Sequence, residues 1–355
     1  MSEQPGAGNA ARAYAAAGVD LALAEDAKAR IGELVRGTRT PLSAGRVGAF
    51  GGMVRVPAGM RQPLLVMSTD GVGTKVLVAL EAHRFDSVGE DLVNHSVNDI
   101  LVHAARPIAF MDYIAGAALP VAMIAGVVEG IARGCRAHGM ALAGGETAQM
   151  PGLYQPGTWD LAGTIVGVVE EDDALHGDRI RPGDLLLGYA STGLHTNGYT
   201  LARRIIFEQA GLTIDGPLAD TGLRVADALL AVHRSYFNAV QPVLPLVHGL
   251  AHITGGGIPG NLVRILPAGA AALVDTGSWE LPPLFRFLQQ AGAVSTEEMR
   301  QVFNLGVGLI AVLPPDAVAV AVTAARAAGV ATWVMGAIVA GETAVRFDQG
   351  SLSAR

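Results

Sequence analysis

Short apolar segments of strand length alternate with longer segments of helical periodicity along almost the whole chain. In the first half we expect strands at 64–69, 107–115, 139–143 and 161–169, and helices at 87–105 and 121–138. In the second half we expect strands at 184–190, 306–313 and 331–339, and helices near 197–210, 222–247, 281–291, 295–303 and 315–328. No longer unit repeats along the chain. The alternation predicts an α/β or α+β protein in which helices cover sheets.

One charged stretch interrupts this pattern, near 170–183, where four consecutive acidic residues are followed by a histidine and further charges. The chain has 355 residues, which suits two domains of roughly 150 residues each. We therefore predict a flexible tail at 1–17, a first domain at 18–172 and a second domain at 173–355.

Composition excludes several classes of protein. Half of the residues are hydrophobic and the formal net charge is −7, so we expect a compact protein that does not bind nucleic acid. The single cysteine, Cys135, excludes an internal disulfide. The longest apolar runs are too short to cross a membrane, and the N-terminus has no export signal. We expect a cytoplasmic protein that does not contact membranes.

The segment 68–75 reads Ser-Thr-Asp-Gly-Val-Gly-Thr-Lys and follows an apolar run of strand character. A carboxylate, two glycines, a hydroxyl and an amine suit a loop that binds a metal ion and a phosphate, although an ordinary tight turn explains the pattern equally well. Lys75 is one of only two lysines, against 23 arginines. Its retention favours a specific role.

The expected helix 87–105 carries an unusual polar stripe. Asp91, Asn94, His95, Asn98 and Asp99 recur at helical spacing and share one face. A solvated face normally carries long Lys, Glu and Arg side chains, whereas short acids, amides and a histidine are better suited to line a site. An exposed polar face is the alternative.

A second glycine-rich segment, Gly144-Gly145-Glu146, directly follows the expected strand 139–143. Paired glycines let a ligand approach the backbone, and Glu146 could join Asp70 and Asp99 as a third carboxylate. Carboxylates brought together need a compensating cation, and Mg²⁺ prefers such oxygen ligands. The alternative is a Gly-Gly turn with a capping glutamate.

The second half contains further loops suited to anions. His195 and Asn197 lie in a Gly-Leu-His-Thr-Asn-Gly segment that opens a helix, and Thr254, Gly255 and Gly256 form another turn. The chain has no Gly-Lys dipeptide and therefore no Walker A loop. The glycine loop 45–52 does not match the dinucleotide fingerprint. A nucleotide would need a different scaffold.

Six segments of the chain resemble sequence motifs of the phosphoribosylformylglycinamidine cyclo-ligases, also called AIR synthetases. They occur in the family's order between about residues 14 and 338, and read TDGVGTK (69–75), VND (97–99), GGETAQMPGLY (144–154), GLHTNGYTLAR (193–203), HITGGG (252–257) and FNLGVG (303–308). The resemblance implies an α+β fold of two domains. In it the N-terminal sheet pairs with that of a second subunit to form a barrel, and helices cover the C-terminal sheet.

The resemblance also implies the reaction. Formylglycinamidine ribonucleotide and ATP give aminoimidazole ribonucleotide, ADP and phosphate, through phosphoryl activation of the formyl amide oxygen. In this scheme the ATP and Mg²⁺ site comprises Asp70, Gly71, Gly73, Thr74, Asn98, Asp99, Gly144, Gly145 and Glu146, with Asp70, Asp99 and Glu146 as metal ligands. Lys75 would neutralise phosphoryl charge and His195 would carry a proton. The ribonucleotide would contact His195, Asn197, Thr254, Gly255 and Gly256.

Three positions depart from the family pattern: Gln149, Arg106 and Gly260. They put fine metal or substrate contacts in doubt. The alternatives are another ATP-dependent enzyme of the same superfamily, such as a small-molecule kinase, and a non-catalytic nucleotide-binding protein.

Overall fold

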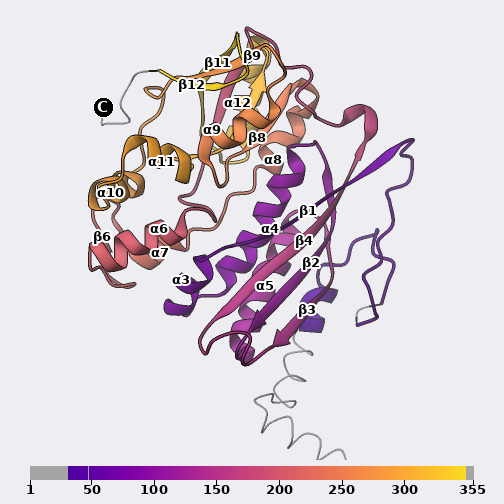
Figure 1. Ribbon diagram of the computed structural model, residues 1–355. Helices are drawn as coiled ribbons and strands as arrows, with labels where there is room; N and C mark the ends of the chain where they lie inside the picture. Colours follow the sequence, from indigo (N-terminus) through magenta and orange to yellow (C-terminus); the bar gives the residue numbers. More distant parts are fainter. Residues whose placement is uncertain (1–30, 47, 349–355) are drawn as a thin grey trace, which may run out of the picture.

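The computed structural model describes residues 31–46 and 48–348, and it contains two mixed α/β halves, each built on its own sheet (Figure 1). The expected tail at 1–17 lies outside the described residues. None of the helices within the described ranges is long and apolar enough to cross a membrane.

The first half is a four-stranded sheet with its helices on one side. Its elements are β1 (Pro63–Gly71), α3 (Lys75–Glu81), α4 (Asp86–Leu101), β2 (Arg106–Gly116), α5 (Val121–Ala137), β3 (Ala141–Gln149) and β4 (Trp159–Glu170). The strand order is β1-β4-β2-β3, in which β2 and β3 are parallel and the other pairs are antiparallel. Because the helices lie on one side, one face of the sheet is covered by them and the other face is not.

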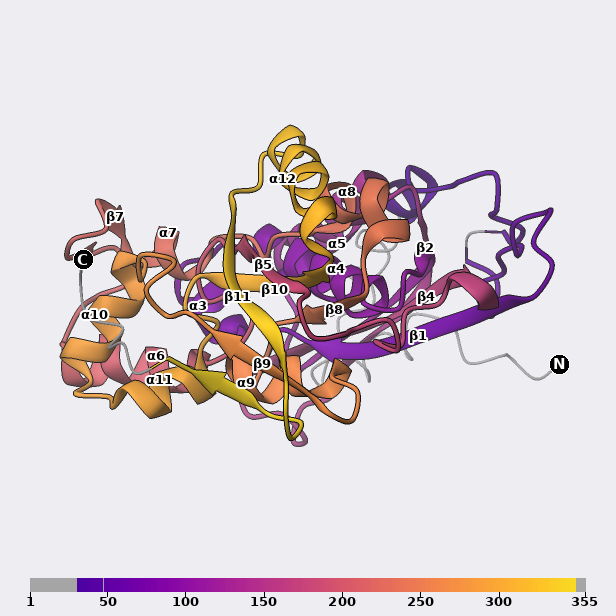
Figure 2. The same ribbon diagram turned by 90° about the horizontal axis from the view of Figure 1, so that it is seen from above.

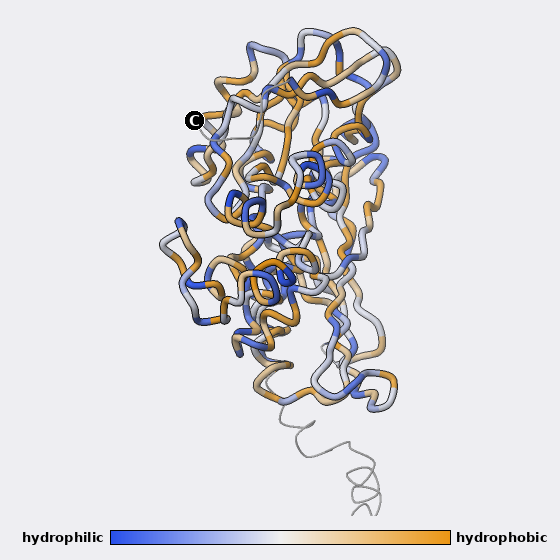
Figure 3. The backbone as a smooth tube through the Cα atoms, turned by 60° about the vertical axis from the view of Figure 1, so that its left-hand side comes forward, coloured by the Kyte–Doolittle hydropathy of each residue, from blue (hydrophilic) through white to orange (hydrophobic). Residues whose placement is uncertain are grey.

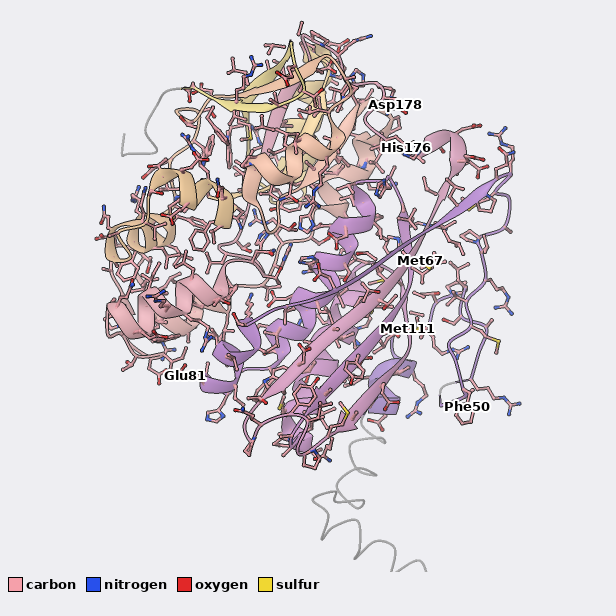
Figure 4. All side chains as sticks on the ribbon, viewed as in Figure 1. Phe50, Met67, Glu81, Met111, His176 and Asp178 are labelled. Atoms are coloured by element: carbon pink, nitrogen blue, oxygen red, sulfur yellow. The ribbon has the colours of Figure 1, made fainter. Side chains whose placement is uncertain are left out.

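Helices α4 and α5 pack closely on the covered face. Two glycines permit this approach, because a Cβ on Gly89 would clash with the Val127 carbonyl and a Cβ on Gly130 with the Asp86 carbonyl. On the opposite face several apolar side chains remain exposed, and Met67 and Met111 mark that face in Figure 4. We call this surface the open face and define it by Leu65, Met67, Met111 and Tyr113.

The second half is a six-stranded sheet with order β12-β9-β11-β5-β10-β8, antiparallel except for β12 and β9. Its strands are β5 (Leu185–Ala190), β8 (Gly249–His252), β9 (Ala270–Val274), β10 (Val307–Leu313), β11 (Thr332–Ala340) and β12 (Val345–Phe347), and a two-residue pair is formed by β6 (Pro217–Leu218) and β7 (Leu223–Arg224). Figure 3 shows hydrophobic segments of the backbone in both halves.

Helices cover both faces of this second sheet. They are α8 (Phe237–Val240), η3 (Gln241–Leu246) and α12 (Val318–Ala327) on one face and α9 (Gly257–Leu262) on the other. The remaining helices of this half are α6 (Tyr199–Arg203), the π-helical η2 (Arg204–Gln209), α7 (Val225–Leu229), η4 (Val263–Ile265), α10 (Pro283–Ala291), α11 (Thr296–Val302) and η5 (Pro315–Ala317). Alternate strand residues point to opposite faces, so Leu187 packs towards α8 and α12, whereas Leu186 packs towards α9.

Helix α4 joins the two halves. It contacts β1 and β4 on one side and α8 and β8 on the other (Figure 2). The largest apolar cluster also crosses the junction, from the first sheet to α6, α7, α10 and α11. The short η1 (Glu171–Asp173) begins the charged connection between the two sheets.

Two expected elements are wrong. The predicted helix 222–247 is broken into α7, an irregular stretch at 231–236, α8 and η3. The strand expected to end at residue 143 instead continues as β3 to Gln149, so the alternative of a Gly-Gly turn is also wrong. The short elements α3, β8, α9, β9 and β12 were not expected. The other expected strands and helices are present, with shifted ends.

Candidate active site

The polar stripe of α4 is buried, so its interpretation as an exposed face is wrong. Three of its side chains hold the irregular stretch 231–236 of the second half. Asp91 Oδ1 accepts a hydrogen bond from the His233 amide at 2.6 Å, and Asn94 Nδ2 donates to the His233 carbonyl at 2.8 Å. Asn98 donates to the Arg234 carbonyl at 2.8 Å and accepts from the Tyr236 amide at 2.9 Å. Asn98 Nδ2 also lies 3.2 Å from His233 Nε2, so the amide that was expected to position phosphate is instead held by the second half.

Lys75 belongs to the same buried junction. Its ammonium lies 2.7 Å from Asp91 Oδ2 and donates to the carbonyls of His195 at 3.1 Å and Ala231 at 2.8 Å. Burial lowers the pKa of Lys75 and raises that of Asp91 to about 6, while their mutual attraction opposes both shifts. The expectation that this ammonium neutralises phosphoryl charge does not fit the structure.

Asp70 and Asp99, expected to act together, are brought together by β1 and α4. His95 Nε2 lies 2.7 Å from Asp70 Oδ2 and 3.4 Å from Asp99 Oδ2. The second oxygen of Asp99 lies 2.8 Å from Nδ1 of His252, which ends β8. The Asp70 side chain is 49% exposed, so this cluster opens to solvent, unlike the pair of Lys75 and Asp91.

The electrostatics of this cluster follow from the two carboxylates. Burial acts to lower the pKa of His95, but Asp70 and Asp99 stabilise the imidazolium and raise it to about 10. Burial likewise opposes ionisation of Asp99, but His252 and His95 hold its pKa well below the usual range. The pKa of Asp70 is also lowered, because His95 outweighs the effect of burial. Both acids are ionised at neutral pH and suit a cation.

Glu146 does not join these two acids within one chain. It lies on β3 in register with Tyr113 of β2, Ala162 of β4 and, across the sheet, Gly71 of β1. Three strand spacings of about 4.8 Å separate the edge strands by about 14 Å. Glu146 also points to the open face with Tyr113, whereas Asp70 points towards α4. The expected trio of ligands on one ion is therefore incorrect for a single chain.

The glycine at position 145 of β3 is explained by its neighbour on β2. Asp112 of β2 lies beside Gly145, and a Cβ at that position would clash with the Asp112 carboxylate. Burial raises the pKa of Asp112 to about 7. Gly145 therefore makes room for a buried acid in the sheet.

The loop after β1 meets the His-Thr-Asn loop of the second half. Gly73 and Thr74 lie with Thr196 and Asn197 around a cavity of about 420 Å³. Gly73 has φ of +55°, a left-handed conformation that favours glycine. Gly71, at the end of β1, donates its amide to Asp70 Oδ1 at 2.7 Å. Backbone amides and hydroxyls thus converge beside Asp70.

The turn at 254–257 adjoins the same region. A Cβ on Gly255 would lie 3.3 Å from Asn197 Oδ1, so the two predicted substrate loops are in contact. Gly256 has φ of +92°. Asn261 fixes the turn, because its Nδ2 donates to the carbonyls of Thr254, Gly255 and Gly257.

His195 is placed deeper than expected. It has a left-handed φ of +62°, is 1% exposed and stacks on His233 with ring centroids 3.9 Å apart. Its Nε2 accepts the Thr192 amide at 3.1 Å. Burial lowers its pKa well below the usual value, so the ring is neutral. It does not line the cavity beside Asn197.

A cluster of histidines behind the acids was not expected from the sequence. His95, His195, His233 and His252 come from four separate segments, and Nε2 of His233 lies 3.1 Å from Nε2 of His252. His95 and His252 carried a signal, because each lies within a segment that was singled out. His233 carried none, because it was assigned to a continuous helix.

The three residues that depart from the family pattern lie apart from Asp70 and Asp99. Gln149 ends β3 and accepts the Leu119 amide at 3.3 Å, and Arg106 begins β2 and is exposed. Gly260 lies in α9, next to Gly256. Gly260 is thus the departure nearest the predicted substrate loops.

Comparison with known proteins identifies the family. Residues 50–169 match the N-terminal domain of AIR synthase related proteins, and residues 181–348 match the C-terminal domain. A phosphoribosylformylglycinamidine cyclo-ligase of Sorangium cellulosum is 47% identical over 330 residues, which are 92% of this chain and 95% of the relative. One of Geobacter sulfurreducens is 48% identical over 306 residues, 85% of this chain and 88% of the relative. The chain belongs to the phosphoribosylformylglycinamidine cyclo-ligase family.

Solved structures share the fold of this family member at lower identity. Thiamine-monophosphate kinase of Stenotrophomonas maltophilia has a TM-score of 0.68 at 18% identity and covers 90% of this chain and 96% of its own. The hydrogenase maturation protein HypE in complex with ATP has a TM-score of 0.58 at 21% identity, over 86% of this chain and 84% of its own. These likenesses establish the architecture.

Proposed function

We propose that this protein closes the imidazole ring of formylglycinamidine ribonucleotide, with ATP as the second substrate, in purine biosynthesis. The observation that carries the proposal is the convergence of Asp70 and Asp99 beside the loop of Gly73 and Thr74, in a chain 43–48% identical to cyclo-ligases over most of its length. Solved structures of the same fold are named as complexes with ATP and with AMPPCP.

The reaction divides into two displacements. The formyl amide oxygen attacks the γ-phosphorus of ATP, an O–P bond forms and ADP leaves. The amidine nitrogen then attacks the activated carbon, a C–N bond forms, and phosphate departs with the oxygen while a proton is lost. Phosphate is a far better leaving group than hydroxide, so ATP is required. The protein contributes chiefly position and electrostatic stabilisation.

The acidic pair fits Mg²⁺. Both carboxylates are ionised, they come from two rigid elements, and they supply the hard oxygen atoms that this ion prefers. Asp70 and Asp99 would hold the ion, which would neutralise charge on the phosphates of ATP. The amide of Gly73 and the hydroxyl of Thr74 would bind the phosphate oxygens, while the Gly71 amide, which donates to Asp70 Oδ1, would orient that carboxylate.

The second-half loops would bind the ribonucleotide. Asn197 lines the cavity of about 420 Å³ opposite Gly73 and Thr74, and the Thr254–Gly256 turn packs against it. We assign His195 to the support of these loops, because it lies behind Thr196 and Asn197 and its ring is neutral and buried. The group that carries the proton in the reaction would then be another one, which reaches the cavity lined by Asn197.

A turnover assay with the two substrates tests the activity. The expected result is equimolar aminoimidazole ribonucleotide, ADP and phosphate. Formation of ADP without the imidazole product would overturn the ligase assignment and favour a kinase. If neither product forms while ATP binds, the protein is a nucleotide-binding protein without catalysis.

We further propose that two copies pair through the open face to form a barrel. Leu65 and Met67 on this face are 51% and 65% exposed, which is unusual for side chains in the middle of a strand. Glu146 points to the same face, beside Tyr113. In such a dimer Gly144, Gly145 and Glu146 would contact a nucleotide only in a site that the partner completes.

Sedimentation equilibrium tests the dimer. The wild type should have twice the chain mass of 36.5 kDa, and Met67→Lys should shift the population towards the monomer. Leu223→Lys, at an exposed leucine of β7 in the second half, is the matched control and should remain dimeric. A monomeric wild type at micromolar concentration would refute the pairing.

We also propose that the chain has a tail at 1–17 and domains at 18–172 and 173–355, that the protein works in the cytoplasm, and that it binds no nucleic acid. The formal net charge of −7 supports the last point.

A further inference from the structure

The acidic pair is surrounded by nitrogen ligands that Mg²⁺ does not need. Ligand atoms of His95, Asp99 and His252 all lie within 4.8 Å of one another. Asp70 Oδ2 lies 2.7 Å from His95 Nε2, on the same side. Metal–ligand bonds of about 2.1 Å in a tetrahedral site place the ligand atoms about 3.4 Å apart. The four side chains thus need only small movements to surround one ion.

His95 has the features of a ligand without its ion. Its side chain is 3% exposed, and its Nε2 is directed at the two carboxylates. Although the atoms are close, the N–H is not aligned with either carboxylate for a hydrogen bond, and Nε2 has no hydrogen-bond partner. A buried ring nitrogen without an aligned hydrogen bond is costly. A divalent cation that displaced the imidazolium proton, with release of that proton, would bind the ring and both acids.

The outer contacts hold both imidazoles in place. His95 Nδ1 lies 2.7 Å from Thr196 Oγ1, and His252 Nε2 lies 3.1 Å from His233 Nε2. Ser68 donates to Asp99 Oδ2 at 3.1 Å. Histidines that bind metals almost always engage their other ring nitrogen in this way, which fixes the tautomer and the ring orientation.

We propose that His95, Asp99 and His252, together with Asp70, form a binding site for a divalent transition-metal ion of the Zn²⁺ class. Two imidazole nitrogens and two carboxylates suit Zn²⁺ or Co²⁺, whereas Mg²⁺ takes oxygen ligands in an octahedron. The inference extends the proposed function, because the two acids are those assigned to Mg²⁺–ATP. An ion of the Zn²⁺ class therefore competes with Mg²⁺ for them.

Cobalt titration of the metal-stripped, nucleotide-free full-length chain tests the site. We expect the visible d–d absorption of four-coordinate Co²⁺ to saturate at one equivalent and to disappear when Zn²⁺ is added. His95→Gln and His252→Gln should each weaken binding by about tenfold or more. His248→Gln is the matched control, because His248 pairs with Asp184 at 2.8 Å outside the cluster, and it should bind as the wild type does.

Thermal unfolding separates loss of the site from loss of the fold. Zn²⁺ should raise the Tm of the wild type and of His248→Gln, and leave that of a folded His95→Gln unchanged. The proposal is overturned if the wild type shows no saturable Co²⁺ bands, in which case His95 is only an internal counter-ion, or if His95→Gln binds Co²⁺ equally well. Ring closure assayed with Mg²⁺ alone tests the proposed function separately, since its failure leaves the Co²⁺ result standing.

Discussion

Helix α4 carries two ion pairs about one turn apart, and they differ in their access to water. Lys75 and Asp91 are fully buried, and the ammonium donates to two backbone carbonyls and pairs with the carboxylate. His95 faces Asp70 and Asp99, and the Asp70 side chain is 49% exposed. The first pair connects the two halves, whereas the second leaves carboxylate oxygens available to a ligand.

A polar stripe on a helix therefore does not define one function. Within the same short stretch of α4, Asn94 and Asn98 hold backbone of the second half, while His95 and Asp99 face β1. The side that each residue faces decides the outcome, since helical spacing places neighbours in the stripe at slightly different angles. A polar side chain whose partners are all buried has a structural role here. A buried side chain beside a solvent-exposed carboxylate belongs to a candidate ligand-binding site.

Breaking the closed pair should have the largest effect on stability. Lys75→Met leaves the buried Asp91 without its cation, so we expect the free energy of unfolding to fall by about 3–5 kcal/mol in urea titrations. The double variant Lys75→Met/Asp91→Asn removes the stranded charge and should recover part of this loss. A decrease below about 1 kcal/mol in the single variant would contradict the structural role of Lys75.

Breaking the open pair provides the contrast. His95→Gln should reduce the free energy of unfolding by only about 1–2 kcal/mol, because Asp70 can be solvated when the imidazolium is removed. Equal losses in His95→Gln and Lys75→Met would erase the distinction between the two pairs.

Asn98 provides a finer contrast within the stripe. Asn98→Ala leaves the Tyr236 amide and the Arg234 carbonyl without their partner, so we expect a loss of about 1–3 kcal/mol in stability. Turnover per folded molecule should change little. A stability change below about 0.5 kcal/mol together with a large fall in kcat would return Asn98 to the phosphate-binding role expected from the sequence.

His138 provides a contrast in the pH dependence of stability, with little effect expected at neutral pH. Burial lowers the pKa of His138 to about 4, and its Nε2 lies 3.2 Å from Asn94 Oδ1. The unfolded chain, with a histidine pKa near 6.5, therefore binds the proton first, and stability is lost as pH falls from about 6.5 to about 4. His138→Gln should remove up to about 1.4 kcal/mol per pH unit of this slope. An unchanged slope would contradict a buried, neutral ring.

Local patterns predicted much of the fold. The apolar runs at 64–69, 107–115 and 161–169 became three strands of the first sheet, because alternation and length specify half-buried strands well. Asp70 and Asp99 were correctly expected to lie together, since the loop after a strand and the end of a helix packed on that strand are neighbours in space.

The failures arose from contacts distant in the sequence. The helix expected at 222–247 is interrupted because α4 side chains take the backbone hydrogen bonds of 231–236, and Pro242 and Pro245 restrict the backbone beyond α8. Lys75 turns inward because of Asp91, on the next helix. Gly145 lies in a strand because Asp112 needs the space. None of these partners can be recognised from spacing alone.

In the proposed function, Asp70 serves a cation and its nucleotide, and its solvent-exposed ion pair with His95 contributes little to the stability of the fold. The decisive experiment compares Asp70→Asn with the wild type in the ring-closure assay and in urea unfolding. We expect kcat to fall by about 100-fold or more, with a change in the free energy of unfolding below about 1 kcal/mol. A loss of stability that accounts for the lost activity, or retention of near-normal turnover, would contradict this role.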